Sequence, residues 1–109
     1  MKITDHQNTK IVATVGPASS SYENLLQLVQ AGVDTFRLNF SHGEHEVHGE
    51  VISRITYINE KYGTHIGILA DLQGPKLRVG KIENNALELA EGDIITFVNE
   101  PCLGTMEKI

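Results

Sequence analysis

The chain has 109 residues, of which 40% are hydrophobic and 21% charged, so it can form a folded core and lacks the composition of a disordered chain. Its net charge is −5 and its 9 lysines and arginines are dispersed, which excludes the clustered basic surface typical of nucleic-acid binding. No apolar run approaches the ~20 residues of a membrane-spanning helix. The single cysteine excludes an intrachain disulfide. We therefore expect a cytoplasmic protein without a membrane partner.

The first expected elements are a strand and a helix. Residues Lys10–Val15 are rich in β-branched side chains, which is typical of a short buried strand. Ser20 and Glu23 have the spacing of a capping box and predict the start of a helix. Gly32 stands where this helix would end.

A second strand, a second helix and a third strand follow. Val33–Phe40 is the second apolar run, and Ser41 with Glu44 predicts another capping box. Ile66–Asp71 is the third run. The helix between them carries apolar residues at spacings of three and four, namely Val47, Val51, Ile55, Ile58 and Tyr62.

This alternation of strands and helices predicts parallel strands, buried on both faces, in an α/β barrel or an open doubly wound sheet. After Pro75 the pattern changes to short β-like runs separated by turn signals, at Leu77–Ile82, Ala86–Leu89 and Ile94–Val98. We therefore expect a tail over residues 1–8, an α/β domain over 9–72 and the start of a β-rich domain over 73–109. Such a short sheet would leave its edges exposed, so the chain is expected to be part of a longer protein or to form a homo-oligomer.

Polar residues fall where the second and third strands end, which is where ligands bind in parallel sheets. Arg37 lies inside an apolar run and needs an anionic partner, which Asp71 on the neighbouring strand could supply. Arg37 then either forms a structural ion pair or clamps a phosphate or carboxylate. Asn39 and Ser41 share its side of the strand and, with Asp71, offer oxygen ligands for a hard cation, although Ser41 could equally be a helix N-cap.

Three histidines, His42, His45 and His48, are spaced three apart. On a helix this spacing makes their side chains drift around the axis, so we expect a solvated helix face rather than a transition-metal site. His42 differs from the others because it lies at the junction of loop and helix, next to the strand end.

Several segments resemble the pyruvate kinase family in order along the chain: Thr9–Ser19, Gly32–Gly43, Leu69–Arg78 and Leu89–Phe97. The resemblance implies the first three strands and two helices of a (β/α)₈ TIM barrel, followed by the beginning of a small β-rich lid domain. It also implies a glycolytic enzyme that transfers the phosphoryl group of phosphoenolpyruvate to ADP, giving pyruvate and ATP.

The same resemblance implies roles for individual residues. Arg37 would be catalytic and would bind the phosphate of the substrate. A monovalent-cation site would use Asn39, Ser41, Asp71 and the carbonyl of Leu72, and the nucleotide would contact Asn39, His42 and Arg78. The family's catalytic lysine and Mg²⁺ ligands would lie beyond Ile109, so we expect the chain alone to be inactive.

One loop departs from many family members that require potassium, which read Asp-Thr-Lys-Gly-Pro-Glu. Here Leu72, Gln73 and Lys76 replace the Thr, Lys and Glu. This set resembles the potassium-independent branch, and the hypothesis is that the Lys76 ammonium replaces the ion. The alternative is that Lys76 is solvated or pairs with a carboxylate of the lid.

Two other functions stay open from the residues. The chain could be a standalone phosphate-binding or interaction module built on the first barrel strands. It could also belong to a different barrel enzyme that uses a divalent metal and a carboxylate substrate. That enzyme would need further carboxylates after the strands, whereas only Asp71 is well placed.

Overall fold

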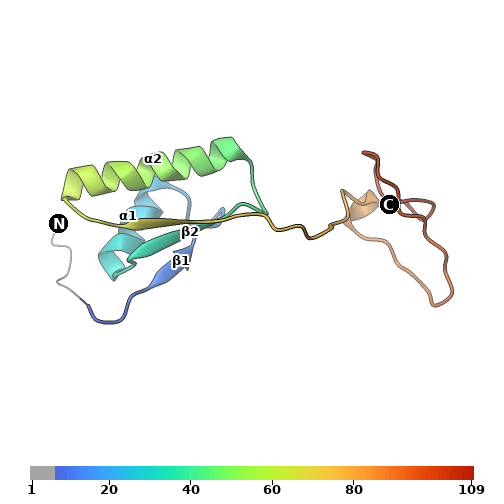
Figure 1. Cartoon of the computed structure of the whole chain (residues 1–109), viewed down its shortest axis with the longest axis horizontal. Coiled ribbons are helices and arrows are strands. Elements are labelled where there is room, and N and C mark those ends of the chain that lie inside the picture. Colours follow the sequence, from blue (N-terminus) through green and yellow to red (C-terminus); the bar gives the residue numbers. More distant parts are fainter. Residues whose placement is uncertain (1–6) are drawn as a thin grey trace. The chain divides into compact units, whose positions relative to one another are not determined.

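The computed structural model describes residues 7–109, which divide into two compact units, one ending at Gly74 and one spanning Pro75–Ile109. Most of the predicted tail, residues 1–8, lies outside the described residues. The first unit alternates strands and helices, as Figure 1 shows. Its elements are β1 (Val12–Thr14), α1 (Tyr22–Ala31), β2 (Thr35–Asn39), α2 (His45–Tyr62) and β3 (Gly67–Asp71).

The strands form one parallel sheet in the order β1-β2-β3, which confirms the predicted α/β class. Each strand is shorter than the apolar run that predicted it, because the paired ladder covers only part of each run. Backbone bonds continue slightly beyond the strands, since the N–H of Val15 donates to the carbonyl of Arg37 and that of Phe40 to the carbonyl of Asp71. The carboxyl ends of all three strands therefore meet at one edge of the sheet.

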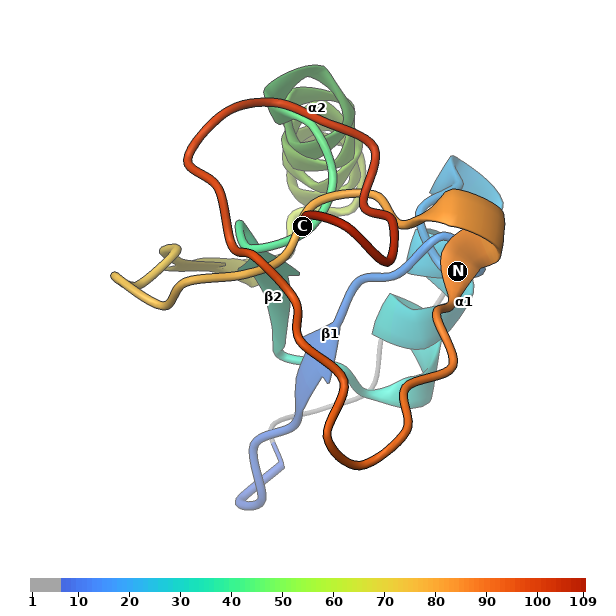
Figure 2. The same ribbon diagram turned by 90° about the vertical axis from the view of Figure 1, so that its right-hand side faces the viewer.

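Both helices cover the same face of the sheet, as the view along the strands in Figure 2 shows. The buried core lies between the helices and the sheet and comprises Leu25, Val29, Val33, Phe36, Leu38, Val51, Ile55 and Ile58. Because side chains alternate along a strand, Phe36 and Leu38 point to the helices and Arg37 points to the opposite face.

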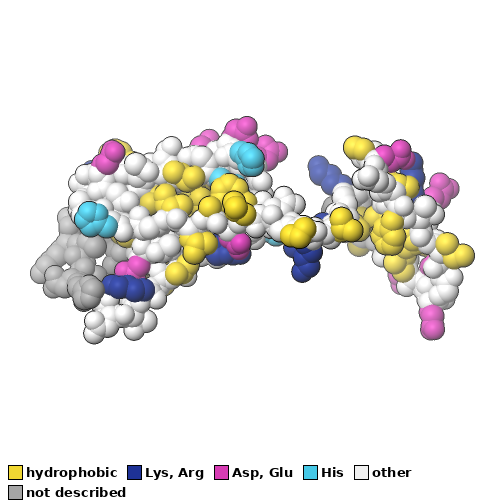
Figure 3. Space-filling view, viewed as in Figure 1, with side chains coloured by type: hydrophobic (Ala, Val, Ile, Leu, Met, Phe, Trp, Pro, Cys, Tyr) yellow, Lys and Arg dark blue, Asp and Glu magenta, His cyan; other side chains and the backbone are white. Residues whose placement is uncertain are grey.

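The opposite face of the sheet is open, which differs from the expectation that the strands are buried on both faces. Val12 is 56% exposed and Leu69 is 43% exposed. Hydrophobic side chains gather at the surface of the first unit in Figure 3. Within the described residues, helices cover one face of the sheet only.

The capping box predicted for the first helix is displaced by one residue. Ser21, not Ser20, is the N-cap, and its Oγ accepts the N–H of Asn24 at 3.3 Å. The hydroxyl of Ser20 instead donates to the carbonyl of Pro17. The helix ends as predicted at Gly32, which has a φ of 113°.

The second predicted capping box is wrong. Glu44 is the N-cap of α2 and makes no side-chain capping bond. Ser41 lies three residues too early because its backbone N–H is held by the side chain of Asn39 in a turn that delays the helix. Gly63 ends α2 in the left-handed region, with a φ of 65°.

The second unit contains little regular structure. The three runs predicted as strands form none, and β pairing within 75–109 is limited to two isolated bridges, Ile82 with Gly104 and Thr96 with Lys108. A 3₁₀ turn spans Glu83–Asn85. Leu77 is 98% exposed, and without an apolar layer to cover it such a run gains little by pairing.

No helix within residues 7–109 is long and apolar enough to cross a membrane.

Asn59 fixes the connection between α2 and β3. Its Nδ2 donates to the carbonyl of Ile66 at 3.0 Å, and its Oδ1 accepts from the Ile66 N–H at 2.9 Å and the Thr64 hydroxyl at 2.8 Å. Because a partly buried hydrogen bond contributes about 1 kcal/mol, we expect Asn59→Ala to lower the free energy of unfolding by about 2–3 kcal/mol.

Urea denaturation of the wild type and the variant measures this change. Thr56→Val is the matched control, since the Thr56 hydroxyl donates to the Ile52 carbonyl of its own helix. An equal loss in both variants would contradict the role assigned to Asn59.

Candidate functional site

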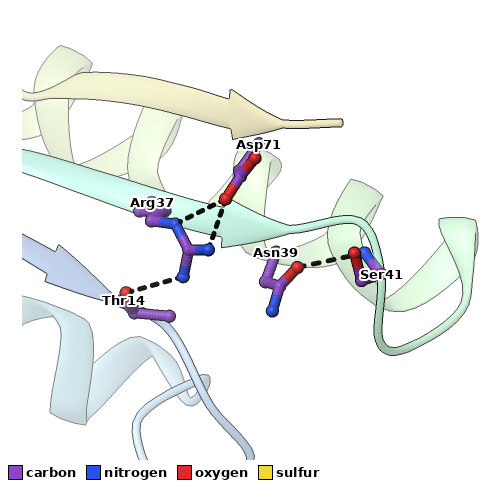
Figure 4. Close-up of polar contacts among 5 residues, drawn as sticks. All are labelled: Thr14, Arg37, Asn39, Ser41 and Asp71. Atoms are coloured by element: carbon purple, nitrogen blue, oxygen red, sulfur yellow. Dashed lines mark hydrogen bonds and ion pairs between the residues drawn. The ribbon is translucent and has the colours of Figure 1, made fainter. Parts of the chain in front are cut away.

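A polar cluster lies at the carboxyl edge of the sheet, on the face opposite the helices (Figure 4). The register pairs Thr14 with Arg37 and Asn39 with Asp71. Residues paired across parallel strands point to the same face, so these four side chains share one surface. Three separate strands therefore contribute to the cluster.

Arg37 is the centre of this cluster. Its Nε donates to Oδ2 of Asp71 at 3.0 Å, its Nη2 donates to the same oxygen, and its Nη1 donates to Oγ1 of Thr14 at 3.2 Å. The predicted Arg37–Asp71 ion pair is thus confirmed. The two side chains are 32% and 45% exposed, so the pair stabilises the fold only modestly, and its main effect is to hold the guanidinium in one orientation.

Asn39 and Ser41 form the turn that follows β2. Oδ1 of Asn39 accepts the Ser41 N–H at 3.1 Å, and the backbone carbonyl of Asn39 accepts the His42 N–H at 3.2 Å. An amide oxygen has a second lone pair, and Ser41 adds a hydroxyl oxygen beside it. Together with the Asp71 carboxylate, these donors are of the hard oxygen type that fits an alkali or alkaline-earth cation.

The three histidines do not converge on a metal position. Within residues 7–109, no group of three or more His, Cys, Asp or Glu side chains is arranged to hold a metal ion. His48 and His45 instead pack around Phe40, with ring centroids 4.5 and 6.2 Å from it. His48 is therefore only partly solvated, and the sequence pattern alone missed this contact because Phe40 was assigned to the strand.

A cavity of about 640 Å³ opens beside the turn, at the ends of β1 and β2. Its walls are mainly apolar and come from both strands, the two loops that follow them, and the first turns of α2. Its lining residues include Pro17, Ser20, Asn39, His42, Val47 and His48. The sequence predicted a ligand near Asn39 and His42 but gave no role to Pro17 or Val47, whose apolar side chains carry no chemical signature.

The remaining predicted site residues fall elsewhere. Leu72 follows β3 directly and is 74% exposed. Lys76 and Arg78 belong to the second compact unit, Pro75–Ile109, whereas Arg37 belongs to the first. Their predicted relation to Arg37 therefore stays a prediction.

Comparison with known proteins gives one consistent result. The family model described as pyruvate kinase, barrel domain, matches residues 6–108. The chain is 47% identical over 103 residues to a pyruvate kinase of Geobacillus stearothermophilus, covering 94% of this chain and 18% of that protein. It is 50% identical over 107 residues to pyruvate kinase 2 of Synechocystis sp., again covering 94% of this chain and 18% of that protein.

A solved structure agrees with these relatives. The crystal structure of Cryptosporidium parvum pyruvate kinase superposes with a TM-score of 0.82 at 33% sequence identity. The match covers 92% of this chain and 21% of that one. The chain thus spans about a fifth of the length of the proteins that it matches.

Proposed function

Because this chain belongs to the pyruvate kinase family, we propose that it forms part of a cytoplasmic enzyme that converts phosphoenolpyruvate and ADP to pyruvate and ATP. In this reaction the bond from phosphorus to the enol oxygen breaks and a bond to the terminal phosphate oxygen of ADP forms. The enolate that remains takes up a proton. The observation that best supports the proposal is the oriented guanidinium of Arg37 at the carboxyl edge of the sheet.

Arg37 would bind the phosphate in transfer. Charge on the phosphoryl oxygens is redistributed as the group moves, and a fixed cation stabilises that arrangement without reorganising. The hydrogen bonds that Arg37 donates to Asp71 and Thr14 fix the orientation of its guanidinium. Because both Nε and Nη2 donate to a single oxygen of Asp71, a phosphate could approach the Nη atoms from the open face.

The cavity would receive the nucleotide. Its apolar walls at Pro17 and Val47 suit a base or ribose, and Asn39 and His42 add polar groups at its rim. The cavity lies beside the Arg37 cluster, since Asn39 belongs to both. Arg78 would contact the nucleotide phosphates.

A monovalent cation would be held by Asn39, Ser41, Asp71 and the carbonyl of Leu72. Its charge would offset that of the phosphates and keep them close to Arg37. In this chain we assign that role to the ammonium of Lys76. Mg²⁺, which the family uses, would be held by residues outside this chain, in line with the fifth of the relatives' length that the chain spans.

Without those residues the chain is expected to be inactive by itself. We predict that the purified 109-residue chain forms no ATP from phosphoenolpyruvate and ADP above the uncatalysed rate. A lactate-dehydrogenase-coupled assay measures this, with the full-length protein as the positive control. ATP formation by the pure chain would contradict the prediction, and an inactive full-length protein would contradict the proposed function itself.

The open face of the sheet predicts self-association of the isolated chain. Val12 and Leu69 are exposed on this face, and within residues 7–109 both outer strands have unpaired edges. We expect light scattering to show a dimer or larger species, and a monomeric mass would count against it. Leu69→Lys should shift the mass toward the monomer, whereas Tyr57→Lys, at a position on α2 that is 50% exposed, should not. For the full-length protein we propose a homo-oligomer.

A further inference from the structure

α2 contacts both loops that border the cavity. One loop, residues 40–44, connects β2 to α2, and the other, residues 15–21, connects β1 to α1. Each loop accepts one hydrogen bond from a side chain near the N-terminal half of α2. The donors, His48 and Arg54, have no place in the reaction described above.

His48 holds the first loop. Its Nε2 lies 2.8 Å from the carbonyl oxygen of His42, and its ring packs against Phe40 at a centroid distance of 4.5 Å. A carbonyl can only accept a hydrogen bond, so Nε2 must carry the proton. A Cβ at Gly43 would lie only 3.4 Å from this nitrogen, so the loop backbone passes close over the ring.

Arg54 holds the second loop. Its Nη1 donates to the carbonyl of Ser20 at 2.7 Å, immediately before the N-cap of α1. Its Nη2 lies 3.4 Å from Glu50, one turn earlier on the same helix. Ser20 lines the cavity, so this bond fixes part of the cavity wall.

We propose that His48 and Arg54 are positioning residues that order the two loops before the nucleotide binds. Loops ordered in advance do not lose conformational freedom on binding, so affinity for the nucleotide rises. The gain in affinity for the nucleotide rests on the function proposed above, whereas the ordering of the loops does not depend on it.

Hydrogen exchange of backbone amides tests the ordering directly. The reporters for the first loop are the amides of Ser41 and His42, both bonded to Asn39. We expect His48→Phe, which keeps a ring against Phe40 but has no donor, to speed their exchange about five- to tenfold, the effect of one lost hydrogen bond. His48→Gln, which keeps a donor, should exchange more slowly than His48→Phe.

The second loop has its own reporters, the amides of Gly16 and Ser19, which are bonded within the loop. Arg54→Met keeps the apolar stem and removes the donor, so it should speed exchange of these amides by a similar factor. Arg54→Lys should restore much of the protection. Glu50→Gln is the matched control, because it removes the charge that faces Arg54 on α2 but leaves the bond to Ser20.

The two loops should respond separately. His48→Phe should leave Gly16 and Ser19 unchanged, and Arg54→Met should leave Ser41 and His42 unchanged. Equal exchange in wild type and variants, or the same response to Glu50→Gln as to Arg54→Met, would overturn the proposal. Both donors are only partly buried, and unchanged far-ultraviolet circular dichroism verifies that each variant is folded.

Kinetics of the full-length protein test the consequence. We expect His48→Phe and Arg54→Met each to raise the KM for ADP about five- to tenfold, with the KM for phosphoenolpyruvate within about twofold of wild type. His45→Phe is the control on α2, since this ring also packs against Phe40 and, within residues 7–109, donates to neither loop. Loosened loops with an unchanged KM for ADP would refute the positioning role. A wild type that does not use ADP would refute the proposed function and leave the exchange result standing.

Discussion

Arg37→Ala in the full-length protein is expected to lower kcat by about 10²–10³-fold, the usual cost of removing one fixed group that stabilises the transition state. The loss should appear in kcat and in kcat/KM together, because the guanidinium would act on charge that moves during transfer. Steady-state kinetics with varied phosphoenolpyruvate measures both constants. The stability of the variant should change little, since the ion pair with Asp71 is partly exposed.

Arg37→Lys should recover only a small part of this activity. Arg37 donates from three nitrogens at once, to Asp71 and to Thr14. A single ammonium group cannot reproduce the planar arrangement of the guanidinium donors. Lys61→Met is the matched control, a cation removed from α2 where it lies over the rings of Tyr57 and Tyr62. Activity of Arg37→Lys equal to wild type would show that only the charge matters and not the geometry.

The full-length protein is expected to work equally well with potassium and with tetramethylammonium, a bulky cation that oxygen ligands cannot coordinate closely. The reason is the Lys76 ammonium, which would supply the positive charge near Asn39, Ser41 and Asp71. Initial rates in the two salts at equal ionic strength measure the ratio. A rate that falls at least tenfold without potassium would contradict the assignment.

Lys76→Glu should create a requirement for potassium. The change replaces the cation by a carboxylate, which would both remove the fixed charge and add an oxygen ligand. We expect the rate in potassium to exceed the rate in tetramethylammonium by about tenfold or more, equivalent to about 1.4 kcal/mol of lost charge stabilisation. Lys81→Glu makes the same charge change elsewhere in the second unit and should leave the ratio near one.

The sequence alone determined the order of the elements and the residues at the strand ends. Apolar runs separated by helical stripes predicted three strands and two helices, because the periods of strand and helix differ. Alternation along the second strand placed Asn39 and Ser41 on the same side as Arg37. The cost of burying an unpaired guanidinium indicated an anionic partner for Arg37, and Asp71 on the neighbouring strand was the candidate.

Local competition between side chains explains the errors at helix starts. Ser20 and Ser41 both had the spacing of a capping residue, but Ser21 caps α1 and Asn39 holds Ser41 in a turn. Adjacent hydroxyl and amide groups compete for the same backbone donors, and spacing does not tell which will succeed. The β-like runs of the second unit were wrong for another reason, because an apolar run bounded by turn signals does not by itself supply a partner strand.

What only the tertiary structure decided is the shape of the site around those residues. The cavity and the bonds from His48 and Arg54 join segments through folding, and Arg54 lies 34 residues from the Ser20 carbonyl that it binds. Carbonyl oxygens and apolar side chains occur throughout a sequence and mark no position by their identity. Residue types therefore determined which functional groups the strand ends carry. Packing of α2 against the loops decided how the loops beside those groups are positioned. Such contacts depend on distances in the folded chain, which no local sequence pattern encodes.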